Sequence, residues 1–238
     1  MDTITTDKQG PRESKISTLP MLRLLQICSP SLPVGAYAYS QGMEWATHAG
    51  WLKNEAETCD WILGLMRHSL GGLDVPILAR LYRGWKENDI GRVKYWTEFL
   101  HASRESAELQ AEDNHMGVAM AKVLGELGIS QANDWKTEPV VTFATMFALA
   151  AVHWEIPIYE TCVGYLWSWA ENQIAAAIKL VPLGQTAGQR ILSQAIKTIP
   201  EVVESGLSLQ DEHIGFLAPA FAIASALHET QHTRLFRS

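Results

Sequence analysis

Apolar residues recur along most of this chain three or four positions apart, which is the spacing of one face of an α-helix. Trp61, Ile62, Leu65 and Met66 form one such set, and residues 159–180 form another. Sustained alternation of apolar and polar residues is nearly absent, and so are the Asn-Gly and Asp-Gly turns of hairpins. The pattern predicts an all-α protein, a single-domain bundle of about nine or ten helices.

Glycine and proline mark the expected helix boundaries. Pro30 lacks an N–H and disfavours helical geometry in the residue before it, so a first helix over residues 21–28 is expected to end there. Asn54, with Glu57 three residues later, has the pattern of a helix N-cap. Gly71-Gly72 is expected to end the helix that Asn54 starts.

These boundaries divide the chain into three parts. Residues 1–19 are polar and mixed in charge, and we expect a disordered leader there, without the apolar core of a signal peptide. Residues 20–231 are expected to form the helical domain, and residues 232–238 a docking tail. The longest apolar runs, residues 140–152 and 215–227, are shorter than the roughly 20 residues that span a bilayer, which indicates buried helices.

The charge balance argues against several classes of partner. The chain has 26 acidic and 19 basic residues, a formal net charge of −7, and no long basic run. Nucleic acids and anionic membrane surfaces attract clustered Lys and Arg, so we expect neither as a partner. The three cysteines are far apart, with no Cys-x-x-Cys pair, which predicts neither a disulfide framework nor a thiolate zinc site. A cytoplasmic protein fits this composition best.

Residues 28–45, which we call the elbow, combine stiff backbone with aromatic side chains. Pro30, Pro33 and Gly35 are expected to hold an extended corner, and Tyr37 and Tyr39 carry hydroxyls on large apolar rings. A stiff segment loses little entropy on binding, so it is suited to docking. An ordinary corner between two helices explains the same residues, and from physics alone both interpretations stay open.

Two short motifs suggest chemistry but lack essential parts. Residues 228–232 match H-E-x-x-H, in which two histidines one helical turn apart bind zinc. No third ligand follows His232, and although an upstream ligand such as His213 stays open, we interpret the motif as a surface helix end. Residues 184–190 resemble a phosphate loop, but they lack the lysine of a Walker sequence and follow no strand.

The charged residues of the body form no convincing active site. Carboxylates such as Glu44 and Glu112 are scattered and are expected to be solvated or structurally paired. Arg104 and Glu108, four residues apart, are expected to form an exposed pair worth only about 0.3–0.5 kcal/mol. No catalytic residue is therefore predicted.

The tail, residues 232–238, differs from the rest of this acidic chain. It sets Leu235 and Phe236 between Arg234 and Arg237. Arginine and aromatic residues are favoured anchors of protein interfaces, so the tail is suited to docking. A tail folded back on its own helical body is the alternative.

Three separated blocks of this chain resemble the urease accessory protein F family. They are residues 24–51, which contain the elbow, residues 170–190, and residues 228–238. Weaker similarity near residues 104–108 and 164–167 extends the resemblance over nearly everything after residue 20. His232 departs from the pattern, since the family commonly has tyrosine there, which supports an accidental match to H-E-x-x-H.

The resemblance implies an all-helical, non-enzymatic nickel-insertion chaperone that forms a homodimer. It would bind the D-type accessory protein, also called H-type, recruit the G-type GTPase, and act on apo-urease to support lysine carbamylation and nickel incorporation. Neither nickel nor GTP is expected to bind this chain directly, because the partner complex handles both. A zinc hydrolase, with chelator-sensitive activity, and a helical regulator unrelated to nickel are the alternatives.

The resemblance also implies residues for partner binding. Tyr39 and Arg234 resemble positions used for partner recruitment, and Gln185, Gln189 and Arg190 resemble a dimer or partner surface. The remaining candidates in the elbow and the tail are Tyr37, Gln41, Leu235, Phe236 and Arg237. We expect the elbow and the tail to lie on one surface.

Overall fold

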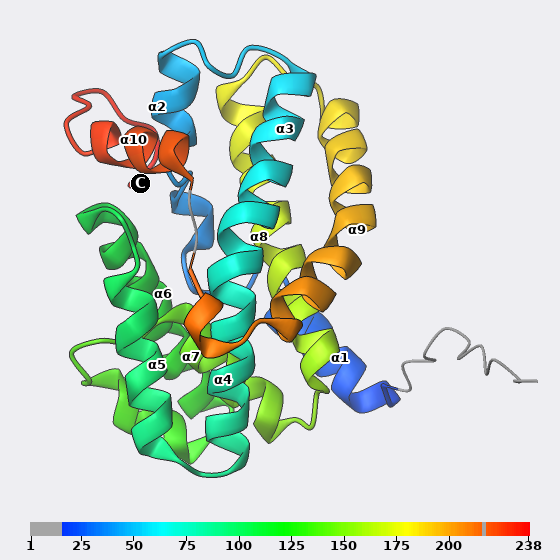
Figure 1. The fold of residues 1–238 in the computed structure, drawn as a ribbon, viewed down its shortest axis with the longest axis vertical. Helices are drawn as coiled ribbons and strands as arrows, with labels where there is room; N and C mark the ends of the chain where they lie inside the picture. The colour runs from blue at the N-terminus through cyan, green and yellow to red at the C-terminus, as the bar shows by residue number, and fades with distance from the viewer. Residues whose placement is uncertain (1–15, 216–217) are drawn as a thin grey trace, which may run out of the picture.

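The computed structural model describes residues 16–215 and 218–238, which fold into ten α-helices with no strand among them (Figure 1). The α-helices are α1 (Thr18–Ile27), α2 (Met43–His48), α3 (Glu55–Leu65), α4 (Val75–Lys86), α5 (Ile90–Ala102), α6 (Ala107–Glu126), α7 (Phe143–His153), α8 (Ile158–Leu180), α9 (Gln185–Ser208) and α10 (Pro219–His228). Shorter segments are the 3₁₀ turns η1 (Ala36–Ala38), η3 (Ser130–Lys136) and η4 (Asp211–His213), and the π-helix η2 (Met66–Asp74). The predicted all-α, single-domain fold is confirmed.

The expected N-cap of α3 is present. The side chain of Asn54 accepts a hydrogen bond from the backbone N–H of Glu57 at 3.0 Å. The carboxylate of Glu57 in turn accepts from the backbone N–H of Lys53 at 2.7 Å. Two N–H groups that the helix itself leaves unpaired are thereby satisfied.

The expected break at Gly71-Gly72 is wrong. Helix α3, the π-helix η2 and helix α4 follow one another without a break from Glu55 to Lys86. A Cβ atom on Gly71 would lie 2.9 Å from Val202 Cγ1 of α9, so the missing side chain lets the two helices approach. The glycine serves packing between helices, which the pattern along one helix does not reveal.

Two groups of buried apolar residues hold the helices together. The larger is centred on α4, which packs against α5, α7, α8 and α9. A second joins α2, α8, α9 and α10 to the tail through Met43, Ile174, Ile191, Ala224 and Phe236. This second core positions α2 beside α10, so segments from opposite ends of the described chain lie side by side (Figure 1).

The predicted leader, residues 1–19, lies largely outside the described residues. Helix α1 begins at Thr18, slightly before the domain boundary expected at residue 20. Among the described helices, none is both long enough and apolar enough to cross a membrane.

Candidate functional site

The elbow turns the chain between α1 and α2, as its prolines predict. Helix α1 ends at Ile27, and Gly35 (φ 80°) and Gly42 (φ 76°) adopt the left-handed conformation that favours glycine. The corner is not simply extended, because the 3₁₀ turn η1 lies between these glycines. The backbone of the elbow is therefore set by local turn chemistry.

The two tyrosines of the elbow have opposite environments. Tyr37 is 73% exposed, whereas Tyr39 is 5% exposed. The Tyr39 hydroxyl lies 3.5 Å from His115 Nδ1, and burial raises the pKa of Tyr39 above its ordinary value. A partner that approaches this face would meet Tyr37 directly, while Tyr39 supports the elbow from within.

The elbow and the tail lie against each other, as expected. The backbone N–H of Arg237 donates to the carbonyl of Ala38 at 2.8 Å. The backbone N–H and the hydroxyl of Ser40 both donate to the carbonyl oxygen of Ser238, at 2.8 and 2.6 Å. These contacts fix the tail along the elbow.

The tail is folded back on the body and also presents side chains to solvent. Phe236 is 5% exposed, and Lys179 Nζ lies 5.6 Å from the centre of its ring. Leu235 is 66% exposed, and Arg234 and Arg237 also reach the surface. The tail is therefore folded back on the body through Phe236, and docking by its exposed side chains stays a prediction.

Gln41 binds within the chain. Its Nε2 donates to Glu112 Oε1 at 2.8 Å, and its Oε1 accepts from Trp169 Nε1 at 2.8 Å. Like Tyr39 and Phe236, this side chain helps to build the elbow and tail, and a direct contact with a partner stays a prediction for all three.

The remaining candidates lie elsewhere. Gln185, Gln189 and Arg190 are exposed in the first turns of α9, and Figure 1 shows α9 on the opposite side of the molecule from α10. The guanidinium of Arg190 donates twice to the Glu55 carboxylate, at 2.8 and 2.5 Å. The residues resembling a phosphate loop are thus the start of an ordinary helix, separate from the tail.

The expected pair between Arg104 and Glu108 is wrong. Helix α6 begins only at Ala107, so helical spacing does not apply to residue 104. Arg104 instead contacts Asp74 at 2.7 Å and Asp113 at 2.9 Å. Burial alone would lower the pKa of Arg104, but these two carboxylates outweigh it and raise the pKa above its ordinary value.

A cavity of about 260 Å³ lies between the elbow, α6 and α8. Apolar side chains such as Leu32 and Trp169 line it together with Arg104, Asp74 and Asp113. Arg104 binds both carboxylates, so this ion network links η2 to α6 at the wall of the cavity.

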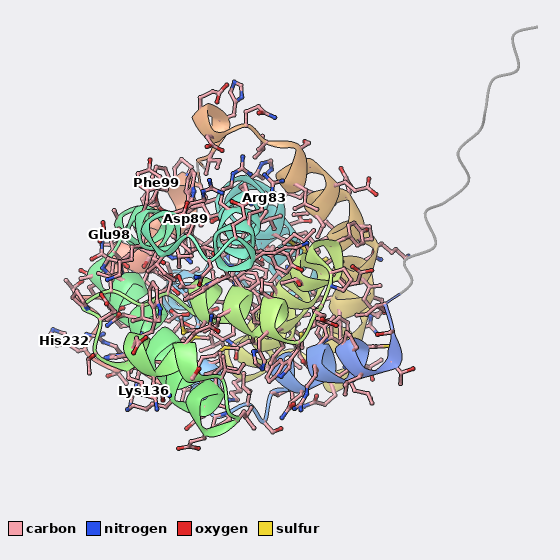
Figure 2. The ribbon with its side chains drawn as sticks, turned by 90° about the horizontal axis from the view of Figure 1, so that it is seen from below. Arg83, Asp89, Glu98, Phe99, Lys136 and His232 are labelled. Atoms are coloured by element: carbon pink, nitrogen blue, oxygen red, sulfur yellow. The ribbon has the colours of Figure 1, made fainter. Side chains whose placement is uncertain are left out.

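The H-E-x-x-H residues do not share one environment. His228 is 0% exposed, so the expectation of a surface helix end is wrong for this residue. His232 is exposed and lies at the outer edge of the molecule (Figure 2). Within residues 16–215 and 218–238, no three His, Cys, Asp or Glu side chains are arranged to hold a metal ion.

Four residues that join the elbow to the tail were not predicted as site residues. They are Glu44, Glu108, Glu112 and His228, and each contacts the tail or a residue that does. Their partners are up to 192 positions away in the sequence, so no local pattern reveals them. The available signal was the presence of charged or polar residues within the helices α2, α6 and α10.

Comparison with known proteins gives one consistent family. The family model described as UreF matches residues 52–196. Urease accessory protein UreF of Alkalilimnicola ehrlichii is 48% identical over 220 residues, which cover 92% of this chain and 96% of that protein. Urease accessory protein UreF 2 of Brucella anthropi is 47% identical over 220 residues, covering 92% of this chain and 97% of its own. Urease accessory protein UreF of Marinomonas sp. is 42% identical over 238 residues, covering 100% of both chains.

Proposed function

This chain belongs to the UreF family of urease accessory proteins, and on this basis we propose that it is a non-enzymatic scaffold for nickel insertion into urease. One observation carries the proposal: the tail is fixed along the elbow while Tyr37 and Leu235 remain exposed. Aromatic and arginine side chains around an apolar residue are typical anchors of protein interfaces. Anchors on a fixed support suit a protein that acts by assembling others.

The proposed partners are the other urease accessory proteins and apo-urease. In this scheme the chain binds the D-type (H-type) accessory protein in the cytoplasm and recruits the G-type GTPase to apo-urease. Lysine carbamylation and nickel incorporation follow in the assembly, where nickel is cargo and GTP is the substrate of the GTPase. Because Arg234 and Arg237 reach the surface beside Leu235, a partner surface with acidic residues around an apolar recess fits the tail.

A second surface is proposed at the start of α9. Gln185, Gln189 and Arg190 are exposed there, on the opposite side from the tail. This separation supports a scaffold that contacts two molecules at once. One of them, at α9, is a second copy of the chain or an accessory partner, and the other is a partner at the tail. The homodimer is part of this proposal.

Alanine substitution of two exposed residues tests the elbow and tail surface. Tyr37→Ala and Arg234→Ala are each expected to weaken capture of the accessory partners roughly tenfold or more, because interface anchors of these types carry most of the binding energy. Co-expression with the accessory proteins followed by affinity pull-down measures the captured amount.

Tyr95→Ala and Arg92→Ala are the matched controls. Tyr95 is 57% exposed and the Arg92 side chain 42% exposed, and both lie on α5, outside the proposed surface. Both control variants are expected to capture as much of the accessory partners as the unsubstituted chain does. Normal capture by Tyr37→Ala and Arg234→Ala, with helicity unchanged in circular dichroism, would sink the proposal for this surface.

A further inference from the structure

His228 lies buried between two carboxylates from different helices. Its Nδ1 is 2.6 Å from Glu108 Oε2 of α6, and its Nε2 is 3.4 Å from Glu44 Oε2 of α2. His228 is 0% exposed, and the Glu44 side chain is 9% exposed. The three side chains form a connected trio that joins α2, α6 and α10.

Each carboxylate of this trio also binds the tail. The two oxygens of Glu44 accept from successive backbone N–H groups, from Leu235 at 2.6 Å and from Phe236 at 2.8 Å. Glu108 pairs through its other oxygen with the guanidinium of Arg234. Three consecutive tail residues are thus held by two carboxylates that share one histidine.

The contacts of Glu44 fix which side chain of the tail faces outward. With both backbone N–H groups held, the Leu235 side chain is 66% exposed and that of Phe236 is 5% exposed. The guanidinium of Arg234 is held additionally by the carbonyls of Glu229 and Gln231, at 2.9 and 2.7 Å. The trio therefore determines the position of the surface that the tail presents.

Because the carboxylates of the trio are largely buried, they favour the position of the tail in which it supplies their hydrogen-bond donors. A buried carboxylate is costly unless charged or hydrogen-bonding partners satisfy it, and hydrogen bonds to charged groups are stronger than neutral ones. The tail supplies two of the donors to Glu44 and the cation at Glu108. Release of the tail would leave these carboxylates with fewer partners, so the trio favours the docked position.

We propose that Glu44, Glu108 and His228 are positioning residues, which hold the tail so that Arg234 and Leu235 are presented next to the elbow. The inference rests on the proposed function, since it explains how the docking surface is held ready for a partner. It also gives the first histidine of the H-E-x-x-H sequence a role that involves no metal.

Limited proteolysis of the isolated full-length chain tests the positioning without any partner. Trypsin cleaves after arginine, and cleavage requires local release of the chain. Glu44→Gln keeps the size of the side chain but replaces one acceptor oxygen by a donor, so cleavage after Arg234 and Arg237 is expected to become about tenfold faster or more. Mass spectrometry of the fragments follows the two sites, and Glu87→Gln, an exposed carboxylate paired with Arg92, is the matched control.

Partner capture provides the second readout. Glu44→Gln is expected to weaken capture by the full-length chain several-fold, because the substitution acts through the tail. Weakened capture without faster tryptic cleavage after Arg234 would overturn the positioning role. Glu108→Gln, which alters the contacts with Arg234 and His228 but leaves the two backbone N–H contacts of Glu44 in place, is the second variant if Glu44→Gln does not fold.

The two readouts separate this inference from the proposed function. Tryptic protection of Glu44→Gln equal to that of the unsubstituted chain would overturn the positioning role. A tail that is released in Glu44→Gln while capture stays normal would leave the positioning intact and overturn the proposed use of the tail by partners.

Discussion

Glu112 is buried where the elbow, α6 and the tail meet. It accepts hydrogen bonds from Gln41 Nε2 at 2.8 Å and from the Ser238 hydroxyl at 2.5 Å. Burial raises the pKa of Glu112 from 4.5 to about 7, although these hydrogen bonds act in the opposite direction. The folded chain therefore holds a proton on Glu112 more tightly than the unfolded chain does.

This raised pKa makes the stability depend on pH. The stabilisation by the proton is complete below about pH 4.5 and is lost as the pH rises through about 7. Between about pH 6 and pH 8, the unsubstituted chain is expected to lose about 1 kcal/mol more unfolding free energy than Glu112→Gln, which has no charge to bury. Urea unfolding of both proteins at the two pH values measures this difference, and equal losses would contradict it.

The surroundings of individual side chains could not be predicted from the sequence. Tyr37 and Tyr39 lie in one turn, so the sequence does not predict that Tyr37 is exposed and Tyr39 buried. The packing of α6 and the tail against the elbow determines this difference. Helical spacing predicts the wrong partner for Arg104, because this residue precedes α6. Its partners are Asp74, at the end of η2, and Asp113, within α6. Residue type is local, whereas the identity of a buried partner depends on the fold.

The helices themselves were largely predictable, because the spacing of apolar residues is a property of each segment. The end of α1 before Pro30 and the cap at Asn54 follow from local stereochemistry. The continuity of α3, η2 and α4 through Gly71 does not, since it depends on the close approach of α9. Glycine alone does not distinguish a helix end from a packing contact.

The packing of α2 against α10 depends on one glycine. A Cβ on Gly42 would lie 2.8 Å from the backbone nitrogen of Ser225, and its φ of 76° disfavours other residues. Gly42→Ala is therefore expected to lower the unfolding free energy by about 1–3 kcal/mol and to loosen the tail beside α10. Urea unfolding gives the first quantity and tryptic cleavage after Arg234 the second.

Gly64→Ala is the matched control for this substitution. A Cβ on Gly64, within α3, would meet no atom within 4 Å. Because alanine favours helix more than glycine does, Gly64→Ala is expected to stabilise the chain by about 0.5–1 kcal/mol. If Gly42→Ala were as stable as the unsubstituted chain, the close approach of α2 and α10 would not be essential.

The complete fold brings together two of the three blocks that resemble the family. The elbow and the tail form one surface through hydrogen bonds between positions about 200 residues apart in sequence, such as Ser40 and Ser238. The block at the start of α9 lies on the opposite side. The resemblance identifies these blocks in the sequence. Which of them lie close together in space could not be predicted, because it depends on contacts between residues far apart in the chain.

The nickel content of urease tests the central proposal most directly. Cells that carry the urease genes but lack this chain would receive it unsubstituted, with Arg234→Ala, or with the control Arg92→Ala, and urease would be purified from each. The proposed scaffold predicts full nickel per urease subunit and full activity with the unsubstituted chain and the control, and a several-fold loss of both with Arg234→Ala. Full nickel loading without the chain, or with Arg234→Ala at normal protein levels, would contradict the account; a change in urease amount alone would instead indicate a regulator unrelated to nickel.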